Sequence, residues 1–173
     1  METIRLIEAV LEIVFDREST APKRYEHEYA ALSESDDDAI GQWLRTAKAR
    51  GEVGDTDPVV LHLMMELYRK IDRLENLLLN NAPQREPLGY KSSIESIGIE
   101  HFKLSEPVLT AGERYYARIE LPVHPKRETA LFFEAVDPSL AKVVRIHPRD
   151  EDEWARYMRS RERIMIRHLK GLE

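Results

Sequence analysis

The side chains best suited to chemistry in this sequence are its six histidines and 32 carboxylates, and their spacing forms no known catalytic motif. His27 lies between Glu26 and Glu28, a local set of side chains that could ligate a metal ion. No second histidine follows at the helical i+4 spacing, so we interpret His27 as a solvated position. The chain contains no HExxH, GxSxG or Walker-type sequence. We therefore expect a non-enzyme without catalytic residues, a metal or a cofactor.

Composition narrows the function classes further. Cysteine is absent, which excludes disulfides, thiol catalysis and cysteine-ligated zinc. The formal net charge of −6 argues against nucleic acid as a partner, because neutralising phosphates needs a basic surface. No run of about 18 uncharged apolar residues occurs, and Arg5, Glu8 and Glu12 interrupt the apolar N-terminus. We expect no leader peptide, no membrane span and a cytoplasmic location.

One apolar seam has the spacing of a helix that packs along other helices. Successive members are 4, 3, 4, 3 and 4 residues apart, which is the repeat of a coiled coil. The seam consists of Val60, Met64, Leu67, Ile71, Leu74 and Leu78. Apolar residues also flank it at Leu61, Leu63, Tyr68 and Leu77, and this wide stripe favours more than two helices. We predict a homo-oligomer, a tetramer, assembled through these residues.

An alternative for this seam stays open. It covers only about three heptads, so the helix could instead pack inside its own chain against the first predicted helix. The two arrangements can coexist if the first helix contributes to the same bundle.

The N-terminal half is predicted to be helical. Ile4, Ile7, Leu11 and Val14 recur at helical spacing and predict a helix over residues 2–17, followed by a loop over 18–35. A second helix runs from the acidic residues 36–38 to Arg50, and a third from about residue 58 to 80. We expect capping by Ser35 and Asp57, a buried face formed by Trp43, Leu44 and Ala47, and a helix end at Asn81 and Pro83.

The character of the chain changes after Pro83. Short β-like runs at 97–104, 115–121, 131–136 and 142–146 are separated by turn residues, and a final helix covers about 151–170. The fold class is therefore α+β: N-terminal helices including an oligomerisation helix, then a small antiparallel β-barrel and a C-terminal helix. We predict a helical oligomerisation region over 1–82 and a barrel domain over 84–173.

The segment from about 88 to 170 resembles a PilZ domain. Its turns and strands carry the resemblance, as does the short acidic turn before a closing amphipathic helix. The matching stretches are Ile97-Gly98-Ile99, Leu104 to Leu109, Gly112-Glu113-Arg114, Ala117 to Pro122, Val144-Arg145-Ile146, Trp154 to Tyr157 and Arg161-Glu162-Arg163. The resemblance implies a six-stranded barrel with flanking helices. Together with the heptad seam, the chain is similar to atypical PilZ proteins that assemble as tetramers.

The cyclic di-GMP motifs of that family are degenerate here. Aligned on Gly98, the D/N-x-S-x-x-G motif has Ser93 at its first position and Glu95 in place of serine. A carboxylate near the dinucleotide phosphates is repulsive, by roughly 4 kcal/mol at ~4 Å before screening. The RxxxR string at Arg69 and Arg73 lies within the heptad helix, where we expect it to face solvent.

The resemblance implies a signalling adaptor that acts through an unidentified protein partner in bacterial type IV pilus function, motility or virulence, without tight cyclic di-GMP binding. Two alternatives remain. One is a divergent cyclic di-GMP receptor that uses Arg69, Arg73, Arg85 or groups near Glu95. The other is a structural scaffold in which the barrel is a spacer.

Overall fold

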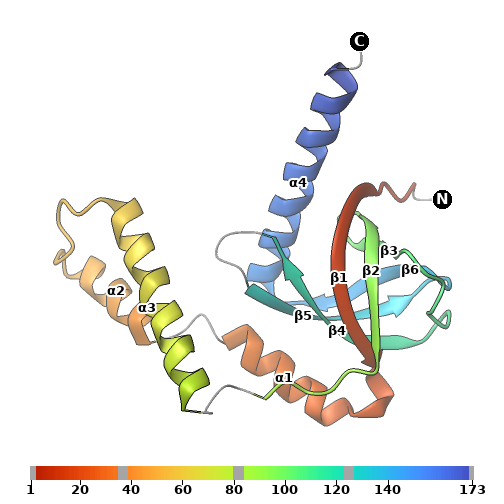
Figure 1. The fold of residues 1–173 in the computed structure, drawn as a ribbon, viewed down its shortest axis with the longest axis horizontal. Helices are drawn as coiled ribbons and strands as arrows, with labels where there is room; N and C mark the ends of the chain where they lie inside the picture. The colour runs from red at the N-terminus through yellow and green to blue at the C-terminus, as the bar shows by residue number, and fades with distance from the viewer. Residues whose placement is uncertain (1–2, 35–38, 80–83, 123–126, 172–173) are drawn as a thin grey trace. The chain divides into compact units, whose positions relative to one another are not determined.

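The computed structural model describes residues 3–34, 39–79, 84–122 and 127–171. A closed antiparallel barrel of six strands, in the order β1-β2-β3-β6-β5-β4, forms the core of the larger unit (Figure 1). The strands are β1 Ile7–Arg17, β2 Tyr90–Ile97, β3 His101–Leu104, β4 Arg114–Leu121, β5 Arg127–Ala135 and β6 Leu140–Ile146. The α+β class, the antiparallel barrel and the C-terminal helix predicted from the sequence are confirmed.

The predicted helix over residues 2–17 is wrong, because this segment contains strand β1. Alternate side chains point into the barrel and are almost completely buried: Ile7, Ala9, Leu11, Ile13 and Phe15. Val10, on the outer side, is 74% exposed. Ile7 and Leu11 fit both a helical and a two-residue period, but the β-branched content and the alternation favour a strand. β1 pairs with β2 on one side and β4 on the other, and so helps to close the barrel.

The predicted loop over 18–35 is also wrong in most of its length. A short 3-10 turn, Glu18–Thr20, leads into helix α1, Pro22–Glu34. Proline is well tolerated at this first position because its missing N–H would be unpaired there anyway. The helix places Tyr25, Tyr29 and Leu32, together with Ala21 just before it, against Tyr116, Ala130 and Phe132 on the outer face of β4 and β5. Strand β4 is therefore covered on both faces.

The last helix, α4, covers Pro148–Gly171 and closes one end of the barrel. Trp154 and Tyr157 are buried within the barrel core, and Met158 packs against it. Arg161 still donates to the Glu8 carbonyl of β1, and beyond Glu162, which pairs with Arg5, the helix continues away from the barrel (Figure 1), with Leu169 61% exposed. The predicted helix over about 151–170 is therefore confirmed with a slightly earlier start.

The first of the predicted β runs, 97–104, divides into two elements. Strand β2 ends at Ile97, a turn follows, and β3 begins at His101. The remaining three predicted runs coincide with parts of β4, β5 and β6. Most of β2 was missed, because Tyr90–Ser96 is rich in serine and has few apolar residues.

The chain divides into two compact units, Met1–Ser33 with Glu86–Glu173, and Glu34–Arg85. The predicted division into 1–82 and 84–173 thus differs at its N-terminal side, where β1 and α1 belong with the barrel. The smaller unit holds helices α2, Ala39–Ala49, and α3, Pro58–Leu78. In α2, Leu44 and Ala47 are buried as predicted, whereas Trp43 is 61% exposed. The predicted cap at Ser35 and residues 36–38 lies outside the described residues.

Candidate oligomerisation face and nucleotide motif

Helix α3 begins with the predicted cap. The Asp57 carboxylate accepts a hydrogen bond from the Val59 backbone N–H at 2.8 Å, and Pro58 occupies the first turn. This pairs one of the amides that a helix start leaves without a partner. The 21 residues of α3 give a rod about 32 Å long. The predicted end at Asn81 and Pro83 lies outside the described residues.

The six seam residues share one face of α3, and all of them are exposed. Their exposed fractions run from 46% at Val60 to 83% at Leu78. Further large apolar side chains widen this face and are about half exposed or more: Val59, Leu63, Tyr68 and Leu77. We call these ten residues the α3 apolar face. Single exposed leucines are ordinary on protein surfaces, whereas a continuous exposed apolar strip is unusual.

The opposite side of α3 is the covered one. Glu66 is buried, with an exposed fraction of 8%, while Leu61, Met65 and Arg69 are half-buried. The Arg69 guanidinium donates to the Glu66 carboxylate at 2.9 Å. The expectation that Arg69 faces solvent is therefore wrong, although Arg73 is exposed as expected. Since residues 7–17 form a strand, the alternative in which α3 packs against an N-terminal helix loses its proposed partner.

The degenerate nucleotide motif lies on β2 and the turn after it. The Ser93 hydroxyl is 2.8 Å from the Ser105 hydroxyl, and the Ser105 N–H donates to the Ser93 carbonyl. The Glu95 carboxylate forms an ion pair with Lys103 at 2.7 Å, and this contact raises the pKa of Lys103. Ser93 and Glu95, the two residues that depart from the motif, therefore each contact a side chain of the barrel itself.

Gly98 is explained by close packing. A Cβ atom there would lie 2.6 Å from the Arg5 carbonyl oxygen, closer than real Cβ contacts. Its N–H donates to the His101 carbonyl at 2.6 Å, and its carbonyl accepts from Trp154 Nε1 at 2.8 Å. The glycine thus joins the β2–β3 turn to α4 and to the segment before β1. Its presence needs no bound nucleotide.

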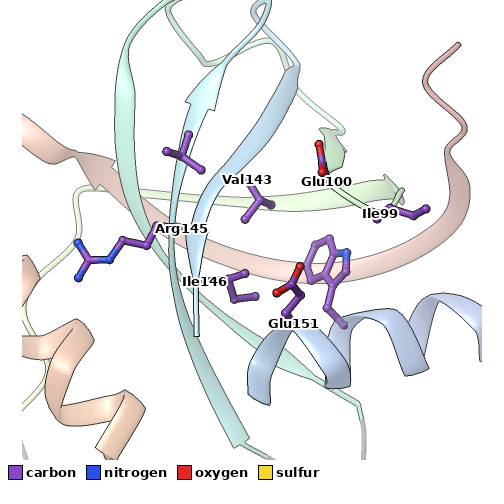
Figure 2. A pocket seen from close by; sticks show the side chains of 8 residues that line it. Ile99, Glu100, Val143, Arg145, Ile146 and Glu151 are labelled. Atoms are coloured by element: carbon purple, nitrogen blue, oxygen red, sulfur yellow. The ribbon is translucent and has the colours of Figure 1, made fainter. Parts of the chain in front are cut away.

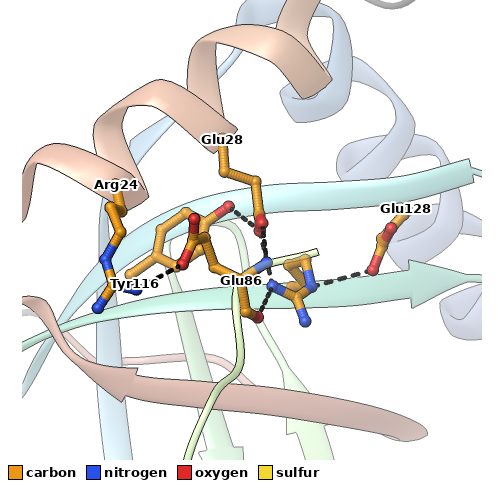
Figure 3. A network of polar contacts seen from close by, with 6 residues as sticks. Arg24, Glu28, Glu86, Tyr116 and Glu128 are labelled. Atoms are coloured by element: carbon orange, nitrogen blue, oxygen red, sulfur yellow. Dashed lines mark hydrogen bonds and ion pairs between the residues drawn. The ribbon is translucent and has the colours of Figure 1, made fainter. Parts of the chain in front are cut away.

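A buried polar network, which the sequence did not indicate, connects α1 to the barrel wall (Figure 3). The Glu28 carboxylate accepts from the Tyr116 hydroxyl at 2.8 Å, from Arg118 Nη1 at 2.6 Å and from the Glu86 N–H at 2.5 Å. Arg118 also donates to the Glu86 carbonyl, and its Nε lies 3.1 Å from the Glu128 carboxylate.

Burial and the Glu28 carboxylate strongly raise the pKa of Tyr116 in this network, so the phenol stays protonated and donates. The residues of this network come from α1, β4, β5 and the segment just before β2, which contains Glu86. The Glu28 carboxylate and the Arg118 guanidinium neutralise each other's charge, and both are hydrogen-bonded. The geometry therefore supports a structural role for this network.

Within the described ranges, no group of three or more histidine or acidic side chains could hold a metal ion. Among the same residues, no helix is long and apolar enough to cross a membrane. Comparison of the chain with protein-family models, with curated proteins and with solved structures returns no match.

Proposed function

We propose that this chain is a homo-oligomeric, PilZ-like adaptor that assembles through the α3 apolar face. The observation that carries the proposal is the exposure of all six seam residues along α3, while the opposite side of the helix is covered. Burying such a strip against copies of itself removes apolar surface from water and is the main driving force for association. The strip is wider than the two positions per heptad of a dimer seam, which favours a tetramer.

The PilZ-like assignment is supported by the architecture together with the sequence resemblance. A closed six-stranded barrel followed by a C-terminal helix is what the resemblance implies. Its role in type IV pilus function, motility or virulence, and its cytoplasmic location, follow from the resemblance and belong to the same proposal.

We also propose that cyclic di-GMP binds weakly or not at all. Ser93 contacts Ser105, Glu95 adds a carboxylate paired with Lys103, and Arg69 is engaged with Glu66. A phosphate ligand would have to displace these contacts and approach a negative charge. Isothermal titration of the full chain should therefore detect no binding at micromolar concentrations. A micromolar or tighter dissociation constant would favour the divergent-receptor alternative.

The assembly itself is tested by placing charge in the α3 apolar face. Leu67→Glu with Leu74→Glu should dissociate the oligomer, because ionised carboxylates are strongly unfavourable in a dry interface. The matched control is His62→Glu with Arg73→Glu, which puts two carboxylates on exposed positions outside that face. Light scattering after size exclusion should show single chains for the first pair and the wild-type mass for the second. The proposal would be contradicted if neither double variant dissociated, or if both did.

The scaffold alternative is best tested with the full chain. A fragment over 84–173 would lack β1, whose inward side chains complete the barrel core. Partner binding should instead be measured with the Leu67→Glu, Leu74→Glu variant, in which the barrel is intact. An adaptor barrel retains partner contacts in this variant, whereas a spacer has none to retain.

A further inference from the structure

A hollow of about 320 Å³ opens on the barrel between β6, the β2–β3 turn and the start of α4 (Figure 2). Its lining is mixed: Ile99, Val144, Ile146 and Trp154 are apolar, Glu100, Arg145 and Glu151 are charged, and more of the exposed lining is polar than apolar. Ile99 is 74% exposed and Val144 46%, so the apolar lining continues onto the surface. A hollow that combines apolar side chains with charged groups can recognise a ligand that carries both kinds of group.

The same hollow adjoins a strand edge that has no neighbouring strand. β3 pairs with β6 only through Leu140–Lys142, and the last contact is the Val143 N–H donating to the Glu100 carbonyl at 2.8 Å. β6 nevertheless continues to Ile146, where it pairs with β5 on its other side. In the described part of the chain, residues 144–146 thus present an edge toward the hollow. Such an edge can accept an added strand through main-chain hydrogen bonds.

The charges around the hollow are negative. Glu100 and Glu151 stand at its rim (Figure 2). Lys142 lies 3.9 Å from Glu100, a long contact between two exposed side chains that neutralises it weakly. Arg145 lines the hollow with its stem, but its guanidinium points away, forming two hydrogen bonds to Glu26 at 2.6 and 2.8 Å and lying over the Tyr29 ring. The rim therefore complements a basic side chain.

The floor of the hollow is held in place before any ligand arrives. Trp154 is 3% exposed, donates to the Gly98 carbonyl and packs edge-on to Phe102 with ring centroids 6.3 Å apart. A fixed floor lowers the entropy cost of binding, because the Trp154 side chain is already ordered.

We propose that this hollow binds an extended segment of a partner protein that carries a basic residue between apolar ones. The segment adds alongside residues 144–146 of β6, places an apolar side chain over Trp154 and brings its lysine or arginine to Glu100 and Glu151. The adaptor role of such binding rests on the function proposed above, but the site belongs to the barrel and not to α3. Peptides that add as strands draw affinity from the main chain and specificity from alternate side chains.

The test uses a short fluorescein-labelled peptide of alternating valine and lysine, measured by fluorescence anisotropy against the full chain. Two comparison peptides replace the lysines with glutamate or place a proline at the centre. We expect the lysine peptide to bind, the glutamate peptide to bind at least about tenfold more weakly, and the proline peptide not to bind, since proline cannot donate to a strand. Absence of binding by the lysine peptide, or equal binding by all three, would overturn the proposal.

Matched variants locate the site. Ile99→Asp should abolish binding, whereas Val10→Asp should not, although both residues are 74% exposed on the barrel. Glu151→Lys should weaken binding about fivefold or more by charge reversal at the rim, and the exposed Glu106→Lys should leave it unchanged. Peptide affinity that is equal in Ile99→Asp and Val10→Asp would refute the location.

The dissociated Leu67→Glu, Leu74→Glu variant separates the proposed assembly through α3 from the proposed peptide site. It should bind the lysine peptide with wild-type affinity per chain, because the hollow is formed by the barrel unit. If the wild-type chain proves to be monomeric, the peptide affinity still tests the hollow. If the peptide does not bind, the light-scattering mass still tests assembly through α3.

Discussion

Replacing Glu28 by glutamine should strongly destabilise the barrel unit. The Glu28 and Arg118 side chains are 6% and 10% exposed, so solvent screens their interaction little. Breaking a buried ion pair by removing one partner costs about 3–5 kcal/mol, because the other charge stays buried. Arg118 keeps the Glu128 carboxylate and the Glu86 carbonyl, so we expect a loss near the lower end, about 3 kcal/mol.

The assay is urea unfolding followed by circular dichroism, at one protein concentration because oligomerisation affects apparent stability. The control is Glu12→Gln, which breaks an ion pair with Lys91 whose side chains are 81% and 67% exposed. Such surface pairs contribute about 0.2–1 kcal/mol.

Tyr116→Phe should cost about 1.5–3 kcal/mol alone and much less when Glu28 is already glutamine, because the hydroxyl donates to that carboxylate. A Glu28→Gln loss no larger than that of Glu12→Gln would refute the interpretation of this network as buried and structural.

Two other substitutions test local features of the barrel. Gly98→Ala should destabilise the fold by about 1–3 kcal/mol in the same urea assay, because the added Cβ meets the Arg5 carbonyl at 2.6 Å. The control is Gly171→Ala, which should be close to neutral because the space around Gly171 is open. Asp137→Ala should cost about 1 kcal/mol at neutral pH by removing the acceptor for the Ser139 and Leu140 N–H groups. Those hydrogen bonds lower the pKa of Asp137, so the stabilising contribution is present above its ordinary pKa of 3.8 and disappears as pH falls through the lower folded-state value. A difference between wild type and Asp137→Ala that grows toward acid pH would contradict this sign.

The sequence predicted those elements whose signals are local. The cap at Asp57, the start of α3 at Pro58 and the seam spacing all depend on neighbouring residues in one helix. The strands β4 to β6 could be located because apolar runs alternate with turn residues over a short span. By contrast, β1 was misassigned because Ile7 and Leu11 satisfy two periods, and only pairing with β2 and β4 decides between them.

The remaining features depend on contacts between distant residues. Tyr116 and Arg118 meet Glu28 across 88 and 90 residues of sequence, and nothing local marks that carboxylate as buried. Helix α1 was missed because its buried face consists of two tyrosines, a glutamate and a single leucine, which a search for aliphatic periodicity does not detect. The hollow beside β6 likewise exists only once the β2–β3 turn and α4 are folded around it.

The most direct test of the proposed assembly is disulfide cross-linking through a single introduced cysteine, since the chain has none of its own. Leu67 lies near the middle of α3. Equivalent residues at the middle of two packed helices meet when the helices are parallel, and also when they are antiparallel and overlap along their full length. Under mild oxidation, Leu67→Cys should form covalent chain pairs on a non-reducing gel, and Arg73→Cys, on an exposed position outside the α3 apolar face, should not. A Leu67→Cys protein that stays as single chains under these conditions would contradict assembly through α3.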